Sequence, residues 1–207
     1  SDILRDHTSQ AIGDRCFGRD AELVATNVTA AIRGLQTNGI LACSKHFPDH
    51  GLARKDSHFE LPIIKESLDE LKNEALIPFI KASKARVEFL MMSHMMVDSI
   101  DNKQPCSLSS LAHEFMRETL KFNKIIITDD LEMKAITDKI KIEDAAVMAI
   151  NAGADMLLYR YLEDAEKALN AIREATKKRA IKKEALNEKL GRIERCKKEF
   201  LSNYRPI

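Results

Sequence analysis

Short apolar runs alternate with longer segments of helical periodicity along this chain. The apolar runs are typical of buried strands, and they predict strands at Gly39–Ser44, Val87–Ser93, Lys124–Thr128 and Asp155–Tyr159. Apolar residues at helical spacing predict helices at Ala21–Leu35, Ser67–Lys84, Ser109–Phe122, Ile142–Asn151, Glu163–Lys177 and Lys182–Ser202. Strands that alternate with helices form βαβ units, so the pattern predicts an α/β fold with a parallel sheet.

Local signals predict several helix ends. Asp20 precedes the first helical segment and is placed to cap it. Ser67 and Glu70 have the spacing of a capping box at the start of the next segment. Gly153 ends the helical segment before the last strand, since glycine accepts the backbone conformation that closes a helix.

Polar side chains follow three of the predicted strands. They are Lys45-His46, Ser93-His94 and Asp129-Asp130. In a (β/α)8 barrel the active site lies at the carboxyl ends of the strands, so this placement predicts a catalytic TIM-type barrel. An open doubly wound sheet would also bind ligands at its strand ends, but the chain has no glycine-rich phosphate loop of the dinucleotide or P-loop type.

The number of strands is too small for a whole barrel. A barrel of this type has eight strands and typically about 250 residues, whereas four strands are evident in a chain of 207 residues. We therefore predict one partial catalytic barrel domain over residues 1–207, incomplete at its N-terminus, with residues 182–202 as a C-terminal helix. Missing first strands would leave open edges and an exposed core, which predicts aggregation, swapping or a complementing N-terminal chain.

Composition and charge exclude several classes of protein. Lysine and arginine number 33 against 32 acidic residues, a net charge of +1, so a surface that binds nucleic acid is not indicated. The basic segment KKRAIKKEALNEKLGRIERCKKEF has glutamates at helical spacing, which is typical of a solvated helix face. No apolar run is long enough to span a membrane. Four scattered cysteines without a CxxC pair favour a reducing compartment, so we predict a cytoplasmic protein.

Histidines, a lysine and acids gather in the segment CSKHFPDHGLARKDSHFELP, at the end of the first predicted strand. Imidazole and carboxylate together suit zinc or a similar ion. The candidate ligands are His46, His50, Asp56 and His58. Alternatively, Asp56 and His58 form an acid/base pair, because side chains two residues apart in an extended loop leave on the same side. The carboxylate would then favour the protonated ring.

Two adjacent acids end the third strand in the segment IIITDDLEM. Carboxylates in such a place are costly to desolvate unless they have partners or a task. Thr128, Asp129 or Asp130 could cap whatever helix follows. An acid that does not cap is then available as a nucleophile, a base or a metal ligand.

Several of these segments occur in a distinctive order. KHFPDHG is followed by DSH, LP, SHMM, PCSLSS, ITDDLEM and AGADMLL, and IGDRCFGRDAELVA precedes them. From about Ala11 to Tyr159 this order resembles glycoside hydrolase family 3, nearest to its N-acetyl-β-glucosaminidase (β-N-acetylhexosaminidase) branch. The resemblance implies a retaining hydrolase that needs no cofactor or metal. It would remove terminal, non-reducing β-N-acetylglucosamine from a carbohydrate, such as a muropeptide in peptidoglycan recycling or a chitooligosaccharide.

The resemblance also implies catalytic roles. Asp129, the first acid of the TDD motif, would be the nucleophile that forms a covalent glycosyl-enzyme. His58 of the DSH loop would be the general acid/base, with Asp56 as its partner. Such a pair suits retention, since an imidazolium protonates the leaving oxygen and the neutral ring then activates water.

Sugar-binding residues are implied in the same way. Lys45, His46 and Arg15 would hold sugar hydroxyls, and Met133, one turn beyond the nucleophile, would lie near the sugar. The charge of Lys45 would also help to keep Asp129 ionised, as a nucleophile must be.

One residue departs from the family's pattern. The loop reads KHFPGHG in the family, and Asp49 stands here in place of its glycine. A positive φ at this position would strain an aspartate, although less than most other residues. We also expect Asp49 to compete with Asp56 for His58.

Two alternatives to an active glycosidase stay open at this point. One is a metal-dependent barrel hydrolase that uses the histidine cluster named above, and a chelator would inhibit only this enzyme. The other is a truncated, inactive fragment or a partner subunit. The intact Asp56, His58 and Asp129 favour activity, whereas Asp49 and the short chain count against it.

Overall fold

The computed structural model describes residues 1–6 and 12–202. Its main sheet has four parallel strands in the order β1-β3-β5-β6, and a second sheet pairs β2 with β4 in parallel. The strands are β1 Cys43–Phe47, β2 Ile63–Ile64, β3 Phe89–Met92, β4 Met96–Val97, β5 Ile125–Asp130 and β6 Met156–Leu158. The α-helices are α1 Ala21–Thr37, α2 Leu68–Glu70, α3 Ile77–Lys84, α4 Ser110–Leu120, α5 Lys134–Thr137, α6 Ile142–Ala152, α7 Leu162–Lys177 and α8 Lys183–Leu201. Shorter helical turns are η1 Gly13–Arg15, η2 His50–Leu52, the π-helical η3 Leu71–Ala75 and η4 Cys106–Leu108.

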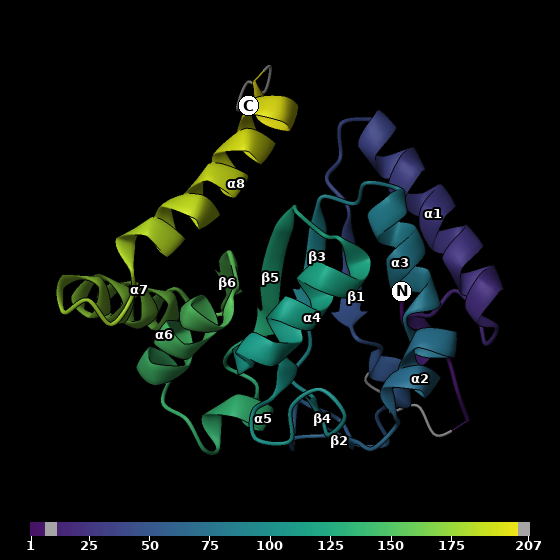
Figure 1. Cartoon of the computed structure of the whole chain (residues 1–207), viewed down its shortest axis with the longest axis horizontal. Coiled ribbons are helices and arrows are strands. Elements are labelled where there is room, and N and C mark those ends of the chain that lie inside the picture. The colour runs from purple at the N-terminus through teal and green to yellow at the C-terminus, as the bar shows by residue number, and fades with distance from the viewer. Residues whose placement is uncertain (7–11, 203–207) are drawn as a thin grey trace.

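Helices cover one face of the main sheet, with α1, α3 and α4 beside β1, β3 and β5 (Figure 1). Successive residues of a strand face opposite sides, and burial follows this alternation. Leu90 and Met92 of β3 are fully buried against the helices, whereas Phe89 and Met91 are partly exposed on the other face. Residues 126–129 of β5 alternate in the same way, which places Asp129 on the open face. The covered and open faces correspond to the outer and inner walls of a barrel.

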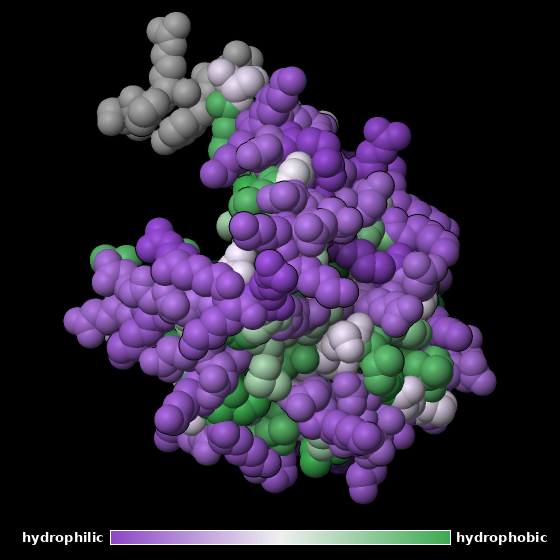
Figure 2. Space-filling model, turned by 60° about the vertical axis from the view of Figure 1, so that its left-hand side comes forward, coloured by the Kyte–Doolittle hydropathy of each residue, from purple (hydrophilic) through white to green (hydrophobic). Residues whose placement is uncertain are grey.

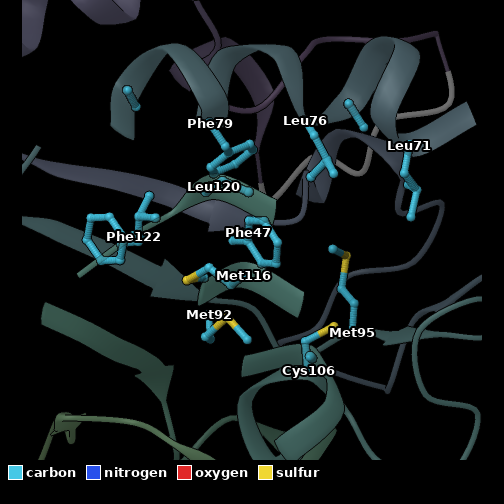
Figure 3. Packing of buried hydrophobic residues seen from close by; sticks show 14 of the residues in the cluster. Phe47, Leu71, Leu76, Phe79, Met92, Met95, Cys106, Met116, Leu120 and Phe122 are labelled. Carbon is cyan, nitrogen blue, oxygen red and sulfur yellow. The ribbon is translucent and has the colours of Figure 1, made fainter. Parts of the chain in front are cut away.

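Aromatic and sulfur-containing side chains fill the space between the sheet and its helices (Figure 3). The ring of Phe47, at the end of β1, packs edge-on against Phe79 of α3, with 5.5 Å between ring centroids and 88° between ring planes. Met92 and Met116 lie on the other side of Phe47 in Figure 3. Because Phe47 directly follows His46, this packing fixes the chain immediately after the Lys-His pair.

The four predicted strands and their parallel arrangement are confirmed. The predicted caps are also confirmed, since the Asp20 carboxylate accepts the N–H of Leu23 at 2.8 Å. Ser67 and Glu70 form the capping box of α2. Gly153 follows α6 with a φ of 134°, which suits glycine.

Two predicted boundaries are wrong. The first strand begins at Cys43 instead of Gly39, because Gly39 has a φ of 77° and lies in the turn after α1. The predicted helix Ser67–Lys84 is divided into α2, η3 and α3. Pro78, in the first turn of α3, lacks the N–H that a continuous helix would donate to the preceding turn.

The hydrophilic colour dominates the face of the molecule shown in Figure 2, with apolar patches between. The last helix, α8, at the top of this view, is mostly hydrophilic and buries only Lys189 and Cys196. This agrees with the solvated helix face predicted for the C-terminal basic segment. Within the part of the chain that the structure describes, no helix is both long and apolar enough to cross a membrane.

A buried ion cluster joins α8 to the sheet. The carboxylate of Asp155, just before β6, is fully buried and accepts hydrogen bonds from Arg117 of α4 at 2.7 Å and Arg192 of α8 at 2.8 Å. It also accepts the backbone N–H of Ile126 in β5 at 2.8 Å. The carboxylate of Asp155 thus connects α4 and α8 to the centre of the sheet. It is also the counter-charge of both arginines.

We predict that Asp155→Ala lowers the free energy of unfolding by about 3–5 kcal/mol, because both arginines lose their buried partner. Urea unfolding followed by circular dichroism measures this loss. Asp164→Ala is the control, since it removes an exposed helical pair with Lys167 and should cost far less. Equal losses in the two variants would contradict the structural role of the cluster.

Candidate active site

The two acids that end β5 have different surroundings. The side chain of Asp129 is 16% exposed, and its Oδ1 accepts the N–H of Asp130 at 2.9 Å. The Oδ1 of Asp130 accepts the N–H of Glu132 at 3.0 Å, which shapes the turn after the strand. Asp130 therefore stabilises the turn, while the Oδ2 of Asp129 faces His46 at 3.9 Å from its Nε2.

His46 lies between two carboxylates. Its Nδ1 is 2.7 Å from the Oδ2 of Asp2, on the side opposite to Asp129. The backbone N–H groups of His46 and His50 donate to the Oδ1 of Asp2 at 2.9 and 2.8 Å. Burial disfavours the charge of Asp2, but the hydrogen bonds and charge of His46 outweigh it and hold the pKa of Asp2 below its usual range. The sequence did not point to Asp2, because it lies 44 residues before His46.

Lys45 is half-buried on β1, next to the inner face of the sheet. Lys45 directly precedes His46, the residue that faces Asp129. The electrostatic support of Asp129 by Lys45 stays a prediction.

Arg15 and Met133, the other two predicted sugar-binding residues, lie in η1 and at the start of α5. Arg15 is exposed in η1, with its Nε 3.4 Å from the carbonyl oxygen of Ile12. Met133 is buried at the start of α5. Their contact with a sugar stays a prediction, and Ala11, where the family resemblance begins, lies outside the described residues.

Asp56 and His58 form the predicted pair. The Nδ1 of His58 is 2.7 Å from the Oδ1 of Asp56, which also accepts the backbone N–H of His58 at 2.8 Å. The N–H groups of Phe59 and Glu60 donate to the carbonyl of Asp56, so the segment is a turn and the expected extended loop is wrong. Slight burial opposes ionisation, but the two bonds from His58 lower the pKa of Asp56, so Asp56 is ionised at neutral pH.

His94, at the end of β3, supports the strand that carries the two acids. It is fully buried, with Nδ1 2.7 Å from the hydroxyl of Ser107 and Nε2 2.8 Å from the carbonyl oxygen of Asp130. A carbonyl only accepts, so Nε2 carries the proton and the hydroxyl of Ser107 donates to Nδ1. Burial lowers the pKa of His94 and keeps the ring neutral. The sequence placed His94 at a strand end without indicating this role.

Asp49 has a φ of 124°, the left-handed backbone that favours the glycine of the family's motif. Its carboxylate is fully buried and accepts a hydrogen bond from Arg5 at 2.7 Å and from two backbone N–H groups. The expected competition for His58 is therefore wrong. Asp49 pairs with Arg5, and Asp56 keeps His58.

The four candidate metal ligands do not converge on one centre. Asp56 and His58 pair with each other, whereas His46 and His50 bond to other groups. Within residues 1–6 and 12–202, no group of three or more histidine, cysteine, aspartate or glutamate residues is placed to hold a metal ion. The structure thus does not bring these four residues together as ligands of one ion.

An acidic strand end beside a Lys-His pair, on the open face of a parallel sheet, lies where (β/α)8 barrels carry their active sites. The glycosyl hydrolase family 3 N terminal domain matches residues 1–196, so the chain belongs to glycoside hydrolase family 3. The resemblance stated above is confirmed.

Relatives and solved structures agree with this membership. A β-hexosaminidase from Tolumonas auensis is 38% identical over 152 residues, which are 72% of this chain and 45% of that protein. One from Methylococcus capsulatus is 35% identical over 150 residues, again 72% of this chain and 45% of that protein. A family 3 β-N-acetylglucosaminidase structure from Paenibacillus sp. str. FPU-7 has a TM-score of 0.95 and 33% identity, and the match covers 100% of this chain and 40% of that one. The predicted partial barrel is confirmed, and the chain spans less than half the length of these relatives.

The buried carboxyl group of Asp49 should make the free energy of unfolding depend on pH. Burial and the charge of Asp2, opposed by Arg5, raise the pKa of Asp49 from 3.8 to about 7. Between these two values the folded chain holds a proton that the unfolded chain releases, so the contribution of Asp49 to stability falls as the pH rises through this window.

We expect the free energy of unfolding of the wild type, minus that of Asp49→Asn, to fall by roughly 3 kcal/mol between pH 4.5 and 7.5. Urea unfolding at several pH values measures this difference. Asp69→Asn, at an exposed position, should give a difference that is flat over the same range. A difference for Asp49→Asn that stays constant or rises with pH would show that Asp49 is ionised throughout.

Proposed function

We propose that this chain carries the catalytic residues of a retaining exo-β-N-acetylglucosaminidase (β-N-acetylhexosaminidase) that forms a covalent glycosyl-enzyme on Asp129. The observation that carries the proposal is the separation of two adjacent acids. Asp130 stabilises the turn after β5, while Asp129 lies on the open inner face beside His46. An ionised carboxylate in this position suits attack on the anomeric carbon.

The proposed reaction has two steps. In the first, Asp129 bonds to C1 of the sugar, the glycosidic bond breaks, and His58 gives its proton to the leaving oxygen. In the second, neutral His58 takes a proton from water, the water oxygen bonds to C1, and Asp129 is released. The bonds from His58 to Asp56 support this cycle, because the carboxylate orients the ring and stabilises its protonated form.

The sugar-binding residues proposed with this mechanism are Lys45, His46, Arg15 and Met133. The hydrogen bonds of His46 to Asp2 support its part, because they hold the ring in one orientation toward the inner face. Lys45 would donate to sugar hydroxyls from the same strand. Arg15, exposed before α1, would close the site from another side.

The names of the relatives support a substrate that contains N-acetylglucosamine. We propose a muropeptide in peptidoglycan recycling in the cytoplasm, with a chitooligosaccharide as the other carbohydrate of this class. Because the chain spans less than half the length of its relatives, a complementing N-terminal chain is part of the proposal. Such a chain would cover the inner face and complete the barrel.

We predict that Asp129→Asn reduces hydrolysis of a chromogenic N-acetyl-β-glucosaminide to background, because an amide does not attack C1. Rates should be measured for the chain alone and with the part of the Tolumonas auensis β-hexosaminidase that this chain does not match. Asp138→Asn, at an exposed position after α5, should keep the wild-type rate. A fluorosugar that traps the intermediate should label Asp129, and a label elsewhere or no wild-type turnover would refute the mechanism.

His58→Ala should lower kcat by roughly 10²–10⁴-fold for a substrate with a poor leaving group, because no group protonates the leaving oxygen. The loss should be smaller for a dinitrophenyl glycoside, whose leaving oxygen needs no proton. Steady-state kinetics on both substrates tests this difference. Equal losses on the two substrates would show that His58 acts on something other than the leaving group.

A further inference from the structure

Ser57, which separates the two residues of the proposed acid/base pair, faces away from solvent. Ser57 is 1% exposed, whereas the side chain of His58 is 55% exposed. The Oγ of Ser57 lies 2.8 Å from the Nε2 of His50, and its carbonyl oxygen accepts the N–H of Ala135 in α5 at 3.3 Å. The middle of this turn is therefore bound both to the loop after β1 and to the helix after β5.

His50 offers a fixed attachment point. It is 2% exposed, and its backbone N–H donates to the Oδ1 of Asp2 at 2.8 Å. Its ring meets the ring of His46 edge to face, with 5.6 Å between centroids. The Nδ1 of His50 has no hydrogen-bond partner among the described residues, so Ser57 supplies the bond that orients the ring there.

The carboxylate of Asp2 connects His50 to His46, which faces the proposed nucleophile, Asp129. Asp2 holds the backbone of His50 and, at the same time, the backbone and Nδ1 of His46. The other nitrogen of His46 faces Asp129. A continuous set of buried hydrogen bonds thus connects the turn of the acid/base pair to the neighbourhood of the nucleophile.

We propose that His50 and Ser57 are positioning residues, whose hydrogen bond holds the turn of the acid/base pair at a set place relative to the nucleophile. The inference rests on the proposed function. A retaining mechanism needs the two catalytic groups at a fixed separation, about 5–5.5 Å for a pair of carboxyl groups. A turn outside the helices and strands keeps such a position only if supporting bonds hold it. The bond between His50 and Ser57 is separate from the contact of Asp56 with His58. Its loss therefore displaces Asp56 and His58 together and leaves their contact intact.

Hydrogen–deuterium exchange of residues 54–60 tests the attachment directly. In Ser57→Ala we expect these amides to exchange about fivefold faster or more, because one buried hydrogen bond is lost. Exchange in β5 should stay at the wild-type rate, which shows that the chain is still folded. Exchange of residues 54–60 at the wild-type rate would overturn the proposal.

Ser107→Ala is a matched control, because it also removes a buried hydroxyl bonded to a histidine, His94. It should leave the exchange of residues 54–60 unchanged. His50→Phe keeps a ring but removes the bond, so it should match Ser57→Ala, and the double variant should exchange no faster than either. His50→Gln, which can bond to the Ser57 hydroxyl, should restore part of the protection. Additive effects in the double variant would overturn the shared role.

Kinetics separates this inference from the proposed function. If the proposed function and the positioning role both hold, Ser57→Ala lowers kcat on the order of tenfold with little change in KM. The reason is that the proton donor is misplaced while sugar binding is kept. His50→Gln should recover part of kcat. Faster exchange of residues 54–60 in Ser57→Ala, with no turnover by the wild type or any variant, would contradict the proposed function alone. Wild-type exchange and wild-type kcat in Ser57→Ala would contradict the positioning role alone.

Discussion

The buried carboxylate of Asp2 organises the end of β1 and the loop that follows it. Removing a charge from water costs several kcal/mol unless hydrogen bonds and an opposite charge offset it. Here two N–H groups of His46 and one of His50 surround the carboxylate. The strands supply the scaffold, but the direction of the His46 ring depends on this carboxylate, which lies outside the main sheet. The site is thus built from two segments far apart in the chain.

The two adjacent acids at the end of β5 have different surroundings. Asp129 and Asp130 are chemically identical and adjacent, yet a strand sends their side chains to opposite sides. Asp130 is engaged by the N–H of Glu132 and, through its carbonyl oxygen, by His94, so it has a structural part in the turn. Asp129 is turned toward the open face and His46. Different surroundings thus give Asp130 to the backbone and leave Asp129 available for the proposed chemistry.

The distance between interacting residues limits what the sequence predicts. The Asp20 cap and the contact of Asp56 with His58 join near neighbours; spacing predicted the cap and offered the contact as one of two alternatives. The first strand was predicted to start at Gly39 instead of Cys43, because hydropathy does not distinguish an apolar loop from a strand, and Ile40 in this loop is 55% exposed. Asp2 acts across 44 residues, so no local pattern marks it. The roles of the site residues came from the family resemblance, since spacing alone left a metal site equally open.

Asp49 shows how the chain accommodates its departure from the family's loop. The residue keeps a positive φ, and its buried carboxylate is balanced by Arg5 and two backbone N–H groups. Arg5 reaches Glu74 as well, 3.2 Å away, so the new charge belongs to a network that includes the helical layer. A buried carboxylate without such partners would be strongly destabilising. The replacement of glycine is therefore accommodated by partners from other segments, in the loop where the proposed chemistry needs a fixed backbone.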